Sequence, residues 1–190
     1  TKDDEEIALI RQAAEIADEA LTSLLVQIAP GATEREIAFE LHRRIIGAGA
    51  DDIAFEIIAA SGPSAANPHA HPGQRRLSPG EMVKIDAGAK VDGYCSDITR
   101  TVFLGEPTDR FLEVYRTVHR AQQTAVAEVR AGVEASTVDA VAREIIADAG
   151  YGDSFGHGLG HGVGLEVHEG PRLSARSEDT LEAGMVVTVE

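Results

Sequence analysis

Carboxylates and imidazoles gather in two short stretches of this chain. Two aspartates eleven residues apart, Asp86 and Asp97, lie in the first, VKIDAGAKVDGYCSDITRTV, and three histidines in the second, FGHGLGHGVGLEVHEGP. The candidate residues, counting the glutamate that ends VVTVE, are Asp86, Asp97, His157, His161, His168 and Glu190. Such side chains bind divalent first-row metals, and a carboxylate-rich set with few histidines suits a pair of hydrolytic ions. The pattern therefore predicts a metal-dependent hydrolase.

The first stretch reads as a β-hairpin, because Asp92-Gly93 is a strong turn signal. A four-residue turn over residues 90–93 would place Asp86 directly opposite Asp97. Opposed side chains have Cβ atoms about 4.5–5.5 Å apart, and two carboxylates so close repel unless a proton or cation lies between them. We expect both aspartates to be metal ligands rather than solvent-facing strand residues.

The second stretch has glycine at every even position from 156 to 164. One face of a strand is then bare, which usually marks a bulge or a close approach of backbone or ligand. The HxxxH spacing of His157 and His161 does not indicate a zincin, because five glycines cannot form the helix that such a site needs. Strict alternation separates His161 from His168, so a bulge or turn near Gly164 is required if both serve one site.

A further pair of histidines, His69 and His71, lies in a loop rich in Pro, Gly and Asn before the Asp86 strand. We expect His69 to contact substrate, and His71 is the weaker candidate. Ser-based catalysis is unsupported, since no GxSxG motif occurs.

Composition excludes several classes of protein. A net charge of −15 over 190 residues argues against a nucleic-acid partner and against an anionic membrane surface. No apolar run approaches the roughly 20 residues of a membrane span. The single cysteine, Cys95, precludes an internal disulfide and fits a cytoplasmic location.

Apolar periodicity organises the chain as two similar halves, residues 1–105 and 106–190, within one catalytic domain. We expect a first helix over residues 4–28 and a second opening at a Thr33–Glu36 capping box. In the second half, a long helix closes near Gly132, and a shorter one is capped by Ser136 or Thr137. Strands are expected over residues 55–60, 82–89, 96–103, 156–167 and 185–190.

The helix–loop segments of the halves align at an offset of about 104, with Thr33 against Thr137. Any two amphipathic helices would look alike to this extent, so the alternative to internal duplication stays open.

Four motifs, IDAGA, SDITRT, HGLGHGVGLEVHEGP and GMVVTVE, carry a resemblance to a known family. Over its whole length the chain resembles the catalytic domain of the pita-bread metallopeptidases, which include methionine aminopeptidase, prolidase and Xaa-Pro aminopeptidase. SDITRT and GLEVHE are most similar to the proline-directed branch. The resemblance implies an α+β fold with two pseudo-symmetric helix–helix–strand units around a curved antiparallel sheet.

The resemblance also implies roles for individual residues. Asp86 and Asp97 would bind two divalent ions, Mn, Co or Zn, together with His161 and Glu190. A bridging water or hydroxide would be the nucleophile.

The remaining roles concern substrate and partners. His157 and His168 would contact the scissile peptide or move protons, and His69 would lie near the substrate. The expected partners are a peptide with proline at its second position and a second copy of the full-length chain.

One departure qualifies the resemblance: the family's second bridging glutamate lies beyond GMVVTVE, and this sequence ends at Glu190. We therefore expect a fragment, truncated at its C-terminus, whose own activity is in doubt. The alternatives are a methionine aminopeptidase and a non-catalytic binding module. Retention of all four metal-ligand candidates favours an enzyme over the binding module.

Overall fold

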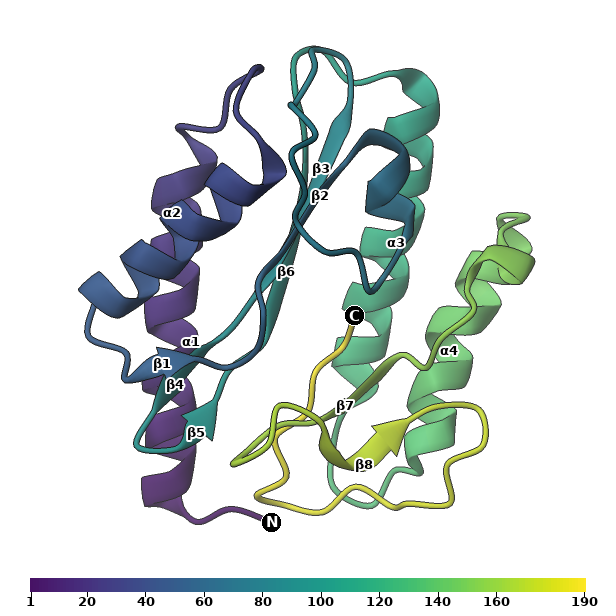
Figure 1. The fold of residues 1–190 in the computed structure, drawn as a ribbon. Helices are drawn as coiled ribbons and strands as arrows, with labels where there is room; N and C mark the ends of the chain where they lie inside the picture. Colours follow the sequence, from purple (N-terminus) through teal and green to yellow (C-terminus); the bar gives the residue numbers. More distant parts are fainter. The chain divides into compact units, whose positions relative to one another are not determined.

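A computed structural model describes residues 1–190, which form two compact units. The first unit comprises Ala8–Pro107, and the second comprises Thr108–Glu190 with the segment Thr1–Ile7. The helices are α1 (Asp4–Leu25), α2 (Glu34–Gly47), α3 (Asp109–Glu128) and α4 (Ala135–Asp148), with short 3-10 turns η1 (Gly62–Ala66) and η2 (Gly152–Ser154) (Figure 1). The strands are β1 (Asp52–Ile53), β2 (Ile58–Ser61), β3 (Met82–Ala87), β4 (Ala89–Val91), β5 (Tyr94–Cys95), β6 (Ile98–Phe103), β7 (Gly160–Gly162) and β8 (Glu169–Leu173).

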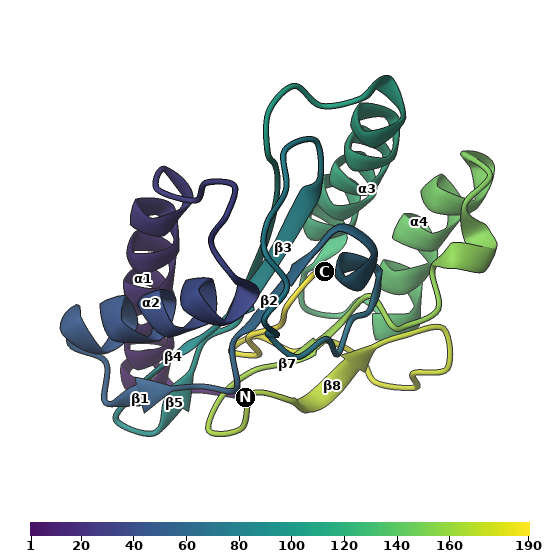
Figure 2. The same cartoon turned by 45° about the horizontal axis from the view of Figure 1, so that its top comes forward.

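In the first unit, α1 and α2 cover one face of an antiparallel sheet of order β2-β3-β6 (Figure 2). Their apolar stripes meet the core face of β3. The buried residues of this core include Leu21, Leu24, Ile37, Leu41, Ile45, Val83, Ile85 and Ala87. A second antiparallel sheet, β1-β4-β5, continues the β3–β6 hairpin.

The capping box that opens α2 is confirmed. Thr33 Oγ1 accepts from the Glu36 amide, and the Glu36 carboxylate accepts from the Thr33 amide. The two hydrogen bonds satisfy amides that a helix start leaves without an internal partner, so α2 begins at Glu34.

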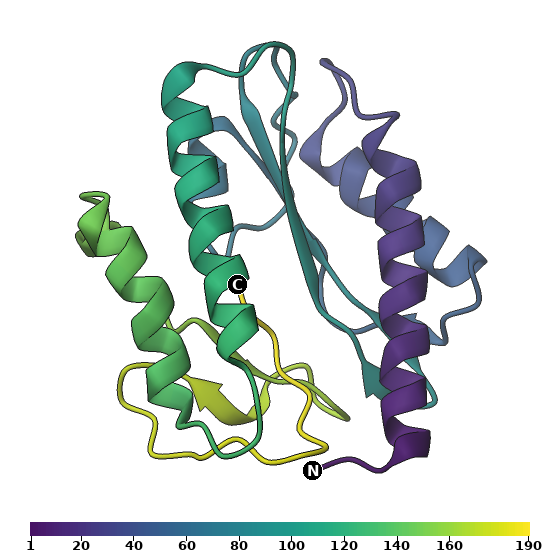
Figure 3. The ribbon, with the colours of Figure 1, turned by 180° about the vertical axis from the view of Figure 1, so that it is seen from behind.

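In the second unit, α3 and α4 pack side by side, and the β7–β8 pair contacts α4 through β8 (Figure 3). The core is made of small and branched side chains from both helices and both strands. It includes Ala121, Ala125, Val138, Ala142, Leu159 and Leu173.

Two expectations for the second unit are wrong in detail. The helix α4 begins at Ala135 with Glu134 in the cap position and no side-chain cap, so neither Ser136 nor Thr137 is the N-cap. The Ala135 amide donates to Asp179 O at 2.9 Å, so a tertiary contact satisfies the first amide of α4.

The strands of the second unit are shorter than the pattern predicts. Only Gly160–Gly162 of the glycine segment is a strand, and residues 185–190 carry a single bridge at Val187. Backbone hydrogen bonds nevertheless tie this end to β7: Thr188 N donates to His161 O, and Glu190 N donates to Leu159 O, each at 2.8 Å.

None of the helices combines the length and the apolar content required to cross a bilayer.

Candidate active site

The aspartate hairpin of the first unit closes with a two-residue turn. Asp92 and Gly93 have φ of 47° and 86°, as a type I′ turn requires. Lys90 is paired with Cys95, and further along the hairpin Asp86 is paired with Thr99. The expectation that Asp86 directly opposes Asp97 is therefore wrong, because the turn lies one residue later than a four-residue turn over 90–93 would.

The shift preserves the face on which the aspartates lie. Moving the pairing by two residues leaves side chains on the same side of the sheet, since the strand period is two. In this register Asp97 is level with Gly88, one diagonal step from Asp86. Such neighbours are about 7–8 Å apart, a separation at which two carboxylates can bind the same pair of ions.

The ladder is interrupted next to Asp97. The Ser96 amide donates to Ala89 O at 2.9 Å, but the Ala89 amide donates to the Ser96 side chain, Oγ, at 3.0 Å and not to a backbone carbonyl. The Ser96 carbonyl approaches Gly88 so closely that a Cβ there would lie 1.9 Å from its oxygen. The glycine of IDAGA therefore makes room for the backbone that carries Asp97.

Asp86 lies on the face of β3 that points away from the helices. Val83 and Ile85 are fully buried in the core, whereas Lys84 and Asp86 alternate with them and are half-buried. Burial lowers the pKa of the Lys84 ammonium, and the Asp86 carboxylate acts in the opposite direction. Lys84 Nζ donates to Asn67 O at 2.8 Å, which connects this face to the His69 loop.

The His69 loop is anchored by a buried polar network. Glu34, only 3% exposed, accepts from Ser61 N and Oγ at 2.8 Å each and from Gly73 N at 3.1 Å. Arg75 donates to Ser61 Oγ and to both carboxylate oxygens of Glu81.

His69 and His71 are both exposed in this loop. The His69 amide donates to Asn67 Oδ1 at 3.0 Å. His71 Nδ1 lies 3.2 Å from Glu56 Oε2 at the surface. The network fixes the ends of the loop and leaves the His69 side chain accessible.

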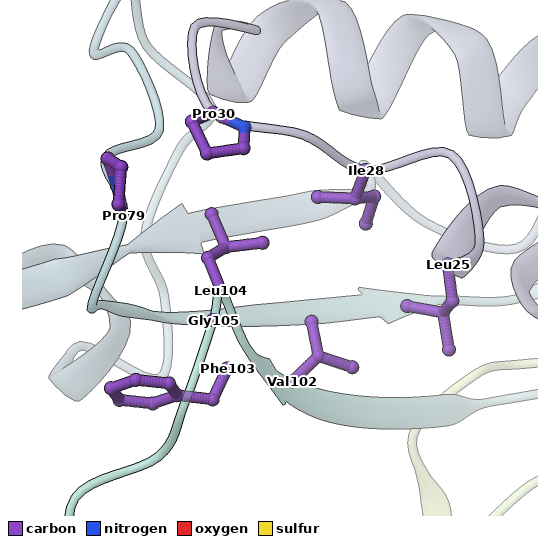
Figure 4. A pocket seen from close by; sticks show the side chains of 8 residues that line it. All are labelled: Leu25, Ile28, Pro30, Pro79, Val102, Phe103, Leu104 and Gly105. Carbon is purple, nitrogen blue, oxygen red and sulfur yellow. The ribbon is translucent and has the colours of Figure 1, made fainter.

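A pocket of about 400 Å³ in the first unit is separate from these residues (Figure 4). Its lining is apolar and lies at the end of β6 remote from Asp97. It consists of Leu25, Ile28, Pro30, Pro79, Val102, Phe103, Leu104 and Gly105. Its lining contains no titratable side chain and none of the candidate site residues.

In the second unit, the bare face of the glycine segment is explained by close backbone contacts. A Cβ at Gly160 would lie 2.1 Å from Thr188 O, and one at Gly162 would lie 2.2 Å from Gly170 O. The glycines thus admit neighbouring chain segments on both sides of His161, as the pattern predicts.

The irregularity required to bring His161 and His168 together is present. The β7–β8 pairing shifts register between His161 and Gly162. The chain then turns back, and the two imidazole rings lie 4.2 Å apart between centroids. The sequence predicts this irregularity near Gly164, and the structure has it slightly earlier, between His161 and Gly162.

His161 also meets Glu190. His161 Nδ1 lies 3.0 Å from Gly162 O, and because a carbonyl only accepts, Nδ1 carries a hydrogen. Nε2 faces Glu190 Oε1 at 2.9 Å.

These neighbours change the pKa of the Glu190 carboxyl. Burial raises its pKa, but hydrogen bonds from His161 and Thr188, with the charges of His161 and His157, outweigh burial and lower it.

This donor set fits a divalent cation. A ring nitrogen with its hydrogen on the other nitrogen presents a lone pair toward a carboxylate, and a proton or a metal ion between them satisfies both. Within the first unit, considered by itself, Asp86 and Asp97 are carboxylates on the same face of the hairpin. Nitrogen and oxygen donors of this kind suit Mn, Co and Zn alike.

His157 is exposed on the glycine segment, and its Nδ1 lies 2.7 Å from Gly158 O. By the same argument Nδ1 donates, which leaves Nε2 as the accepting nitrogen. Two residues that sequence reasoning missed, Asp139 and Arg143, hold the backbone on either side of His157. Their i,i+4 spacing of acid and base was the only available signal.

Comparison with known proteins shows the family to which this chain belongs. The model of metallopeptidase family M24 matches residues 8–190. The Xaa-Pro dipeptidase of Pyrococcus furiosus is 45% identical over 189 residues, 100% of this chain and 54% of that protein. The chain thus spans about half the length of this curated relative.

Solved structures agree with the sequence comparison. An Xaa-Pro dipeptidase from Bacillus anthracis has a TM-score of 0.97 and 45% identity, covering 99% of this chain and 53% of that one. The X-Pro aminopeptidase of Thermotoga maritima has a TM-score of 0.96 and 45% identity, covering 99% and 53%. The expected α+β pita-bread fold is confirmed, and the chain belongs to metallopeptidase family M24.

Proposed function

We propose that the protein containing this chain hydrolyses peptide bonds next to proline, as an Xaa-Pro dipeptidase or aminopeptidase. Relatives at 45% identity that are an Xaa-Pro dipeptidase or an X-Pro aminopeptidase support this proposal. The structural observation that carries it is the cluster in the second unit, where His161 Nε2 faces Glu190 Oε1 at 2.9 Å beside the His168 ring.

We assign metal binding to four residues, Asp86, Asp97, His161 and Glu190. Family membership implies divalent metal, and we propose two ions, with manganese first among the candidates. When bound, such ions lower the pKa of a shared water and polarise the substrate carbonyl.

The remaining histidines act on substrate in this proposal. His168 donates a proton or a hydrogen bond to the charge that develops on the scissile group. His157, with Nδ1 bound to Gly158 O, presents Nε2 to the substrate. His69, exposed beside the Lys84–Asn67 contact, is a substrate-binding residue.

The test uses the full-length parent protein. Dipeptides Xaa-Pro, longer peptides with proline second, and matched peptides with alanine in place of proline are assayed after chelation and after adding Mn, Co or Zn. We expect cleavage only next to proline, and only with metal present. Equal cleavage of the alanine peptides, or full activity after chelation, would overturn the proposal.

Peptide length decides between the two activities, since a dipeptidase leaves the longer substrates intact. We also propose a homodimeric parent, which light scattering on the same sample would measure.

A further inference from the structure

A buried acid–base pair in α4 has no part in the proposed metal chemistry. The Asp139 side chain is fully buried, which is rare for a carboxylate unless it is paired. Arg143 Nε donates to Asp139 Oδ2 and Arg143 Nη2 to Oδ1, each at 2.8 Å. This two-pronged geometry fixes the plane of the guanidinium group.

The remaining hydrogen bonds of Asp139 and Arg143 go to the backbone of the segment that carries His157. Arg143 Nη1 donates to Phe155 O and Nη2 to His157 O, each at 2.9 Å. Asp139 Oδ1 accepts from the Leu159 amide at 3.1 Å. Three backbone groups, the carbonyls of Phe155 and His157 and the amide of Leu159, are therefore held by two side chains of α4.

An aromatic contact adds a second path to the same ring. The guanidinium carbon of Arg143 lies 4.3 Å from the centre of the Phe155 ring. Phe155 in turn meets the His157 ring edge-on, with centroids 4.9 Å apart. Arg143 thus constrains both the backbone and the ring of His157.

The segment requires such a constraint. Gly156 and Gly158 flank His157. Gly156 has no neighbouring atom within 4 Å of a Cβ position, whereas a Cβ at Gly158 would lie 2.9 Å from Leu173 O. Glycine has the largest backbone freedom of any residue, so an exposed segment of this kind would sample many conformations if untethered.

We propose that Arg143, held by Asp139, is a positioning residue for His157. The inference rests on the proposed function in one respect only, that His157 acts on substrate.

Lysine is the informative substitution. It preserves the positive charge, but its single ammonium cannot reproduce a planar fork that bonds a carboxylate and two carbonyls together. In the full-length parent we expect Arg143→Lys to lower kcat/KM for an Xaa-Pro peptide by about 10–100-fold, as small misplacements of a reacting group do. Arg130→Lys, an exposed arginine paired with Glu128, is the matched control and should leave kcat/KM unchanged.

A double-mutant cycle separates positioning from general stability. If Arg143 acts through His157, Arg143→Lys should cost less than about twofold once His157→Ala is present. An equal loss of kcat/KM in both backgrounds, or no loss in the parent, would overturn the inference.

Hydrogen exchange of residues 155–159 is a readout that does not depend on activity. These amides should exchange faster in Arg143→Lys while those of α3 are unchanged. If the parent cleaves no Xaa-Pro peptide, the proposed function fails, and unchanged exchange would then overturn the positioning role separately.

Discussion

The two units share one backbone scheme at the point where their second helices begin. Gly31 N donates to Leu77 O in the first unit, and Gly132 N donates to Leu181 O in the second, each at 2.8 Å. The next contacts also correspond, since the amides of Leu77 and Leu181 donate to Ala32 O and Val133 O at 2.8 Å. An antiparallel bridge follows in each unit, Thr33 with Arg76 and Glu134 with Thr180.

The side chains at this shared start differ. Thr33 makes a capping box with Glu36, whereas Glu134 makes no side-chain cap. The return segment supplies a backbone acceptor to the first amide of each helix, Arg75 O in the first unit and Asp179 O in the second, with or without a side-chain cap. The correspondence of these contacts supports internal duplication over a chance likeness of amphipathic helices, because the backbone contacts agree where the local sequences differ.

The chemistry diverges further. The first unit offers carboxylates from a hairpin, and the second offers imidazoles from a glycine segment, with Glu190 beside them. Each unit also buries one helical carboxylate against a segment that carries a candidate histidine, Glu34 for the His69 loop and Asp139 for His157.

The largest expected effect concerns the imidazoles of the second unit. In the full-length parent, His161→Ala should lose bound metal and activity together, because His161 is a proposed ligand. His168→Ala should retain metal and lower kcat by about 10²–10⁴-fold, as loss of a proton-transfer group does. Metal analysis and kinetics measure both, with His42→Ala in α2 as the control. Equal metal loss in the two variants would show that the roles are wrongly divided.

The close-contact glycines test whether both units depend on backbone approach. Gly88→Ala and Gly160→Ala should each lower the free energy of unfolding by about 1–3 kcal/mol or more, because each Cβ would overlap a carbonyl oxygen. Gly156→Ala, with open space around it, is the matched control. Urea denaturation provides the measurement, and sensitivity in only one unit would contradict the comparison.

The network of the first unit should respond to acid. Hydrogen bonds from Arg75 lower the pKa of Glu81 in the fold, against the opposing effect of burial. A carboxyl with a lowered folded pKa stabilises the fold above its unfolded pKa of about 4.5, and this stabilisation is lost as pH falls through the folded pKa.

Glu81→Gln should therefore destabilise by about 1–2 kcal/mol at pH 7 and progressively less in acid. Urea denaturation at several pH values measures this effect, with Glu19→Gln on the exposed face of α1 as control. A destabilisation that does not change with pH would contradict the argument.

The smallest effect is expected at the helix starts. Thr33→Ala should lower the free energy of unfolding by about 1 kcal/mol through loss of the cap. Glu134→Ala should change it by less than about 0.5 kcal/mol, because its side chain makes no cap hydrogen bond. Thermal or urea unfolding of the two variants compares them, and equal losses would mean that Glu134 has an unrecognised role.

Local patterns in the sequence were sufficient for several features. The apolar periodicity of α1 and α3 and the capping box at Thr33 depend on residues a few positions apart. The Asp92-Gly93 signal located a hairpin, but the expected four-residue turn over 90–93 was one residue too early. The types of the proposed ligands were equally readable, because metal chemistry restricts them to few side chains.

Other features depended on segments far apart in the chain. The predicted pairing of the hairpin strands was wrong by two residues. Side chains alternate between the faces of a strand every two residues, so the sequence pattern is equally compatible with either pairing. The sequence alignment pairs the halves at an offset of 104 residues, whereas the bridges at Thr33 and Glu134 correspond at an offset of 101. The two offsets differ by three residues, about one helical turn, so the apolar faces of the helices match at either offset.

Tertiary structure alone decided how the second unit's site is built. The register shift after His161, the pairing of Glu190 with Leu159, and the grip of Arg143 on the His157 segment each join residues that no local pattern connects. The glycines of this segment predicted that some backbone would approach closely. Only the fold determined which one, because a missing side chain specifies space and not its occupant.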